Sequence, residues 1–312
     1  MKAFKASKKL FLVLFVIALA SATILAHYTN ISTYSSAYVA YAEAQISAKQ
    51  EFARVHRELD RDLKIDPNVQ SLMYDDIMAD ETLDYSQREA KLNEIGYYTF
   101  SYQEQPSTLS GSQDMEFQIV YVTYNSADDT WKVGANIRWY DSANRETGIP
   151  GSSALGFSVG QKFNVGGEDY AGVLLSNIVG DTSGVSIKSS TMRISGDNTT
   201  DYTNPNRVPM VDSIGGAVFG FQDYTTITKT WVDWWNPFVQ HYEYAHSVVL
   251  SAVSLIFSSN FANIHGNLTG YYGHTWEDVK LNSIGFQTNG FNFGWSSSSG
   301  NWDAKSGFDV QF

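Results

Sequence analysis

The chain has 312 residues, no cysteine and a formal net charge of −12. This length allows a sizeable buried core in one large or two ordinary domains, and without cysteine no disulfide can contribute to stability. An acidic surface repels phosphate backbones, and the lysines and arginines form no clustered patch, so we expect no nucleic acid partner.

The first 26 residues have the pattern of an export signal. Four lysines precede an apolar run that starts at Leu10, and small residues follow at positions 18–22. This order is typical of a signal peptide with A-x-A-like cleavage sites. Residues 10–26 are also about the minimum length that spans a bilayer, so the alternative is an uncleaved anchor through which the chain contacts the membrane. In either case we expect residues 27–312 to be extracytoplasmic, either secreted or anchored at the cell surface.

Residues 27–101 are predicted to be a helical region. Residues 35–65 contain neither glycine nor proline and are rich in helix-forming side chains. A seven-residue repeat places Tyr38, Gln45, Phe52 and Leu59 on one stripe, which is apolar except at Gln45. A coiled coil needs three or four clean heptads, so we expect this helix to lie on the body of the protein instead.

Two shorter helices carry signals at their ends. Asp66 and Pro67 match an N-cap followed by proline at the first helical position. Ser86 and Glu89 match a capping box, and Gly96 is placed to end that helix.

A polar linker at 102–114 separates the helical region from a predicted β domain at 115–312. Every second residue from Trp131 to Trp139 is apolar or small, and residues 116–140 predict a hairpin. Further predicted strands lie at 170–179, 185–195, 246–258, 278–287 and 290–297. No helical pattern separates these strands, so the fold class that we predict is α+β, an N-terminal helical segment followed by a mainly antiparallel β-sandwich-like domain. Residues 195–209 are a candidate internal break.

No group of residues passes a test for catalysis or metal binding. Residues 156–160 match G-x-S-x-G, but the flanking segments lack the strand and the helix that a nucleophile elbow needs. His241 and Glu243 would share a strand face, and His274 has acidic neighbours, but each arrangement is more typical of a surface hydrogen bond. Zinc and phosphate-loop motifs are absent from the sequence. We therefore predict no catalytic residues, no metal and no cofactor.

The densest aromatic run of the chain is at 230–246, with three Trp, one Phe and two Tyr. We expect the strand face that carries Phe238, Tyr242 and Tyr244 to be buried. The alternative is that every ring of this run belongs to the core. The candidates for an exposed ligand-binding platform are Trp231, Trp234 and Trp235.

These features favour an exported β-sandwich protein that acts as a binding or structural module. Its candidate partner is a carbohydrate or a cell-surface protein, bound through the Trp-rich bend. A second hypothesis is a membrane-active protein, either one that inserts a β-hairpin, with residues 246–260 as a candidate strand, or an outer-membrane barrel, because the chain ends in alternating aromatic residues. A secreted hydrolase is the third hypothesis.

Overall fold

The structure is a computed structural model, and it describes the larger part of the chain. The described residues are 34–80, 82–103, 115–139, 156–196, 211–246, 250–275, 281–287, 290–296, 301–305 and 310–312. The predicted leader at 1–26 lies outside them, as does most of the predicted linker and of the candidate break at 195–209.

The α+β class is confirmed, because in the described part of the chain three helices are followed by antiparallel sheets. The helices are α2 (Tyr34–Leu59), α3 (Pro67–Ala79) and α4 (Tyr85–Glu94), with a short 3-10 helix η1 (Ser259–Asn263). Residues 97–101, at the end of the region predicted to be helical, belong instead to the first strand. In the described part of the chain, no helix has the length and the apolar character needed to cross a membrane.

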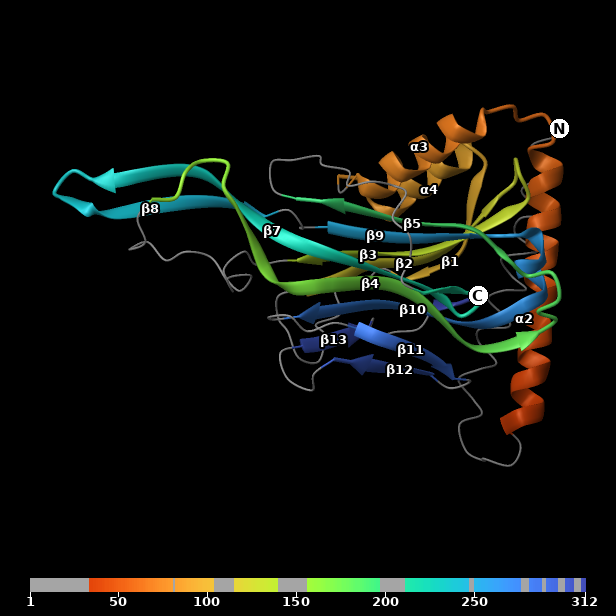
Figure 1. The fold of residues 1–312 in the computed structure, drawn as a ribbon. Helices are drawn as coiled ribbons and strands as arrows, with labels where there is room; N and C mark the ends of the chain where they lie inside the picture. The colour runs from red at the N-terminus through yellow and green to blue at the C-terminus, as the bar shows by residue number, and fades with distance from the viewer. Residues whose placement is uncertain are drawn as a thin grey trace.

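Two large sheets form the body (Figure 1). The five-stranded sheet has the order β1 (Tyr97–Gln103), β2 (Met115–Asn125), β3 (Thr130–Trp139), β9 (Leu250–Phe257) and β5 (Ile187–Ser195). The seven-stranded sheet contains β13 (Asn301–Lys305), β10 (Ile264–Thr275), β4 (Lys162–Gly180), β7 (Gly216–Asp233) and β6 (Val211–Ser213), with β14 (Val310–Gln311) beside β10 and β8 (Asn236–His246) beside β7. A separate pair is formed by β11 (Leu281–Gln287) and β12 (Gly290–Trp295).

The main core lies between the two large sheets. Phe117 and Val133 from one sheet and Val173 and Phe219 from the other are fully buried in one cluster. A Cβ atom at Gly270 of β10 would lie 2.6 Å from the ring of Phe117, so glycine is required for the two sheets to approach this closely. The alternation of apolar and polar residues along the strands therefore gives each sheet one apolar face, and these two faces pack together as a sandwich.

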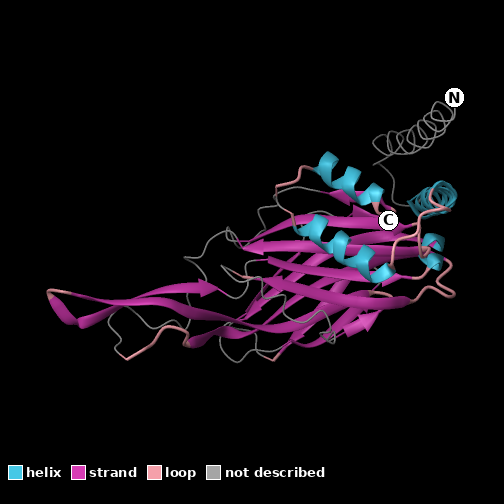
Figure 2. Ribbon diagram, turned by 90° about the horizontal axis from the view of Figure 1, so that it is seen from above, coloured by secondary structure: helices cyan, strands magenta, loops and turns pink. Residues whose placement is uncertain are grey.

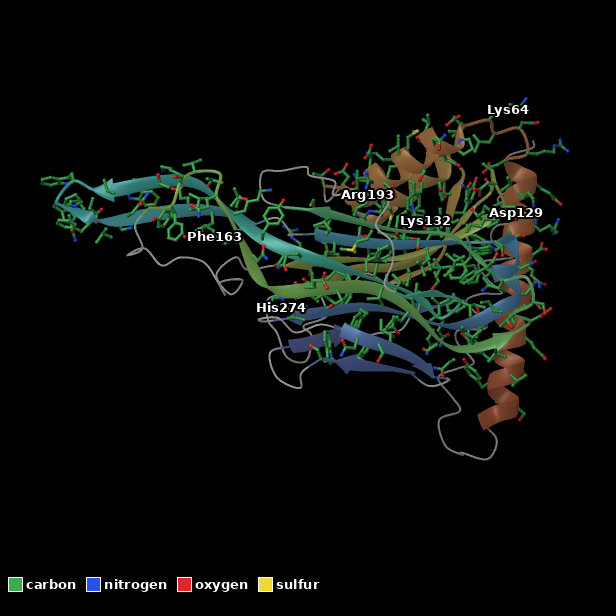
Figure 3. All side chains as sticks on the ribbon, viewed as in Figure 1. Lys64, Asp129, Lys132, Phe163, Arg193 and His274 are labelled. Carbon is green, nitrogen blue, oxygen red and sulfur yellow. The ribbon has the colours of Figure 1, made fainter. Side chains whose placement is uncertain are left out.

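Helices α3 and α4 cover the outer face of the five-stranded sheet, which changes the environment of its polar residues (Figure 2). The pattern around Trp131 places Lys132 and Asn136 on the face away from the core, yet both are buried. Lys132 Nζ donates to Asp75 Oδ1 at 2.9 Å, and Arg193 Nη1 lies 3.2 Å from the other oxygen of that carboxylate (Figure 3). Burial lowers the pKa of Lys132, and Asp75 opposes this shift.

The helix caps differ in how well the sequence predicts them. The Asp66 side chain accepts from the backbone N–H of Asn68 and Val69, which confirms the predicted N-cap of α3. The capping box of α4 lies two residues before the predicted one, because Asp84 and Gln87 exchange backbone and side-chain hydrogen bonds. The Ser86 prediction was wrong because both positions offer a short polar side chain, and only the fold decides where the chain enters the helix.

Helix α2 packs across one end of the sandwich, against β10, β4 and η1. Its buried face contains Ala42, Lys49, Phe52 and His56. The predicted apolar stripe is thus wrong at its end, since Leu59 is 59% exposed. The packed face is rotated by about one position and carries two titratable side chains, Lys49 and His56, that the predicted stripe does not include.

Candidate functional site

The outer parts of β7 and β8 form a two-stranded ribbon that leaves the sandwich. β4 pairs with β7 from Lys162↔Thr226 to Leu174↔Gly216, and from Ile227 outward the described partner of β7 is β8. Figure 1 shows this ribbon projecting from the body at the end away from α2. At about 3.3 Å per residue, the stretch from Ile227 to the turn is about 20 Å long.

The loop at 156–161 braces the base of this ribbon. Gly160 N donates to Ile227 O at 2.8 Å, and Gln240 Nε2 donates to Phe157 O at 3.1 Å. The ring of Phe157 packs edge-on against Phe163, whose position at the base of the ribbon is marked in Figure 3. This loop contains the G-x-S-x-G match, and it continues into strand β4 rather than into the helix that a nucleophile elbow needs.

The turn of the hairpin consists of two tryptophans. Trp234 and Trp235 lie between the paired residues Asp233 and Asn236. Two-residue hairpin turns usually hold Asn or Gly because their favoured types need positive φ, and neither tryptophan has a positive φ. The register shift that follows leaves residues 237–239 as a bulge on β8. The largest side chains therefore occupy a turn that local backbone preference would give to small ones.

The rings at this turn are among the most exposed apolar side chains of the described residues. We call the following set the aromatic tip: Trp231 (41% exposed), Val232 (52%), Trp234 (89%), Trp235 (67%) and Phe238 (77%). The indoles of Trp234 and Trp235 are perpendicular, with centroids 5.6 Å apart and planes at 89°.

The prediction that Phe238 is buried is wrong, whereas Tyr242 and Tyr244 are half-buried. The prediction assumed that a second sheet covers one face of the strand, but the ribbon has already left the sandwich at Phe238. A signal was present in the sequence, because large rings occupy both faces near Pro237 and no single covering layer could bury both sets.

Polar side chains near the aromatic tip lie close to one another across the two strands. His241 Nε2 lies 3.1 Å from Asp233 Oδ2, and Lys229 Nζ donates to Glu243 Oε1 at 3.0 Å. The sequence hypothesis of a His241–Glu243 pair is thus replaced by two cross-strand pairs. The imidazole also stacks on Trp231, with centroids 5.2 Å apart and planes at 16°.

A second polar cluster lies in the body, around the fully buried Asp169 of β4. Its carboxylate accepts from Tyr272 Oη at 2.6 Å, from His274 Nδ1 at 3.0 Å and from Thr275 N at 3.0 Å. Figure 3 shows His274 at the far end of β10 from α2. Asp169 and His274 are more than a hundred residues apart, so no local motif links them. The donors saturate a carboxylate that is closed to solvent, and the cluster joins β4 to β10.

A small hollow lies on the outer side of the five-stranded sheet. This hollow of about 240 Å³, open space included, lies beside α4 and is lined by Tyr85, Tyr102 and Tyr121 among others. Among the described residues, no group of three or more His, Asp or Glu side chains is placed to hold a metal ion. The aromatic tip is therefore the strongest candidate site.

Comparisons with known proteins add no functional information. No protein-family profile and no curated protein matches the chain. Among solved structures, the chain is similar to the Clostridium perfringens NetB toxin in the membrane inserted form, with 10% identity over 69% of this chain and 95% of that one and a TM-score of 0.22. A similarity at this level supports no conclusion about fold or function.

Proposed function

We propose that the chain is an exported, extracytoplasmic β-sandwich protein that binds a target through the aromatic tip. Trp234 and Trp235 are the principal binding residues, and Trp231 supports them. The observation that carries this proposal is the exposure of three indoles and Phe238 at the end of a ribbon that projects from the body.

Energetics favours a bound state for such a tip. Burying one large apolar side chain stabilises an interface by about 1.5–3 kcal/mol. Singly exposed apolar residues are ordinary on protein surfaces, but clustered ones mark interaction sites. Tryptophan is also enriched among the residues that contribute most to binding. Rings that were needed only for folding would lie in the core, where Trp131 is fully buried.

The site of action in this proposal rests on the sequence of the leader. An apolar segment behind four lysines would export residues 27–312, and exposed indoles at the end of a ribbon would then meet cell-surface components. A carbohydrate or a surface protein fits this setting, because an indole offers a flat apolar face and one hydrogen-bond donor.

The test is a binding panel with matched variants of the full chain. Immobilised cell-wall polysaccharides, glycans and phospholipid vesicles are probed with the native chain and with Trp234→Ala/Trp235→Ala. A Leu59→Ala/Leu72→Ala variant serves as the control, since it removes two apolar side chains of 59% and 58% exposure away from the tip.

We expect the tip variant to lose about tenfold or more in affinity for one class of target. Its free energy of unfolding should change by no more than about 0.5 kcal/mol, because the substituted side chains are exposed. The control should bind as the native chain does. Equal binding of all three proteins to every target would contradict the proposal.

A further inference from the structure

We infer that the target of the aromatic tip is the interfacial layer of a phospholipid bilayer without net charge, into which the tip inserts to a shallow depth. This inference rests on the proposed function and names its partner. It depends on the orientation of the rings, the charges around them and the backbone of the bulge.

The orientation of the rings favours a deformable target over a flat one. Trp234 and Trp235 stand at 89° to each other at the apex of a turn, so they share no plane on which a sugar ring could stack. The third indole, Trp231, has one face covered by His241. The tip is convex, and a convex apolar surface buries all its rings together only in a recess or in a medium that closes around it. The interfacial layer of a bilayer can close around such a surface, and tryptophan is enriched there.

The charges determine which bilayer is favoured. Asp233 is the only charged residue in the sequence from Thr230 to Gln240, and its carboxylate lies beside His241. The segment from Thr230 to Gln240 thus supplies no lysine or arginine to attract anionic headgroups, and the chain as a whole is acidic. Binding should depend on apolar contact rather than on counterion release, which indicates zwitterionic lipid and weak dependence on salt.

The backbone N–H groups of the bulge are mostly not in need of water as a hydrogen-bond partner. An unpaired N–H group is costly in lipid. Of the three bulged residues, Pro237 has no N–H, and the N–H of Phe238 donates to Asn236 Oδ1 at 3.3 Å. At two of the three bulged residues, therefore, no backbone N–H group would be left without a hydrogen-bond partner at the interface.

The ion pair of the ribbon limits the depth. Lys229 and Glu243 are 61% and 53% exposed in their side chains. Lys229 and Trp234 are five positions apart, which corresponds to about 16 Å of extended strand. Amphipathic elements at the interface bury their apolar surface about 5–10 Å deep. That depth covers Trp234 and Trp235 at the apex. Trp231 marks the edge of the layer, because Lys229 Nζ lies 5.2 Å from its ring centroid and remains paired with Glu243 in water.

The experiment is depth-dependent quenching of tryptophan emission by phosphatidylcholine vesicles whose acyl chains carry bromine. The full chain is compared with Trp234→Ala/Trp235→Ala, so that binding through the N-terminal apolar segment is common to both. Phe238→Asp is the second variant, because it places a charge at the tip and leaves every indole unchanged. Leu59→Ala/Leu72→Ala is again the control.

We expect quenching from the shallowest bromine position in the native chain and in the control. In Trp234→Ala/Trp235→Ala that component of quenching should disappear. In Phe238→Asp the partition into vesicles through the tip should fall about tenfold or more. Adding anionic lipid should not strengthen binding, and raising the salt concentration to about 0.5 M should change it less than twofold.

Two outcomes would overturn the inference, and they separate it from the proposed function. If quenching is the same in the native chain and in both tip variants, while the tip variant loses binding to a glycan or an immobilised protein, the bilayer is the wrong partner and the tip remains a binding site. If the tip variants behave as the native chain does toward every target, including vesicles, both proposals fail.

Discussion

The imidazole of His241 lies flat on the indole of Trp231, with the ring centroids 5.2 Å apart. The two residues are direct cross-strand partners in the ribbon, and Nε2 of the same imidazole lies 3.1 Å from Asp233 Oδ2. One side chain of β8 therefore contacts two residues of β7 just before the turn. This contact holds Trp231 at 41% exposure, whereas Trp234 at the apex is 89% exposed.

Replacing His241 by alanine should loosen the end of the ribbon without unfolding the body. A cross-strand aromatic pair contributes about 0.2–1 kcal/mol, so global stability should fall by less than about 1 kcal/mol. We expect faster hydrogen exchange at the backbone amides of residues 229–233. Glu243→Ala, which removes the ion pair with Lys229 and leaves the His241–Trp231 stack in place, is the matched control. Exchange rates as slow as those of the native chain would show that the stack does not order the tip.

Lys49 should make stability rise with pH in the alkaline range. It is fully buried, its Nζ donates to Ile264 O, and its amino group faces the rings of Phe261 and Phe312. Burial lowers its pKa well below 10.5, so the unfolded chain keeps a proton that the folded protein has already released. Unfolding then takes up a proton, and stability increases as the pH approaches 10.5.

The comparison that isolates this effect is with Lys49→Met, which fills a similar volume without a charge. Buried tyrosines such as Tyr74 and Tyr121, whose pKa is raised by burial, oppose stability above pH 10 equally in both proteins. In urea unfolding, we expect the free energy of unfolding of the native chain to increase relative to that of Lys49→Met between pH 7.5 and 10. Parallel pH curves would mean that Lys49 is not buried as an amine in solution.

His265 should make the protein sensitive to acid. Burial is the main reason that its pKa falls from 6.5 to about 4, and nearby Lys49 lowers it further, against a hydrogen bond from Nδ1 to Phe312 O. The unfolded chain binds the proton first as the pH falls from 6.5 to 4, so stability decreases through this window and is not reduced further below it. The loss is at most about 3 kcal/mol.

His265→Asn, whose amide can replace the Nδ1 donor, should flatten this dependence. Its stability at pH 7.5 should be equal to or below that of the native chain, because it fills less space. Chemical unfolding at intervals from pH 4 to 8 measures both curves. If the two proteins lose the same free energy across that window, another group causes the acid sensitivity.

Asp169 should be more important for stability than any surface carboxylate. Three donors from β10 converge on it in the absence of solvent. Hydrogen bonds to a charged group are each worth about 1.5–3 kcal/mol, so Asp169→Asn should cost at least about 2 kcal/mol. Asp169→Ala should cost more, because it leaves the buried donors unpaired. Calorimetric unfolding measures both, and Asp181→Asn, at a fully exposed carboxylate, is the control. A cost within about 0.5 kcal/mol would show that the cluster is not a structural link.

Much of the fold could be predicted from local patterns. The alternation around Trp131 and Val133 predicted β3, and the Asp66-Pro67 pair predicted the start of α3. Side-chain period and cap chemistry are properties of a few neighbouring residues, so they can be read without knowledge of the fold. The aromatic run was also visible in the sequence as an unusual density of rings.

Tertiary structure decided which of these residues are covered. The same period-two rhythm places Lys132 under α3, where it is buried, and Phe238 on a ribbon with no covering layer, where it is 77% exposed. Lys49 is buried because helix α2 packs against η1 and β10, and Asp169 reaches His274 because β4 and β10 are paired. The sequence alone determined the elements, because propensity and periodicity act over short distances. Exposure depends on which distant segment packs over each face, and that was decided by the assembled sheets.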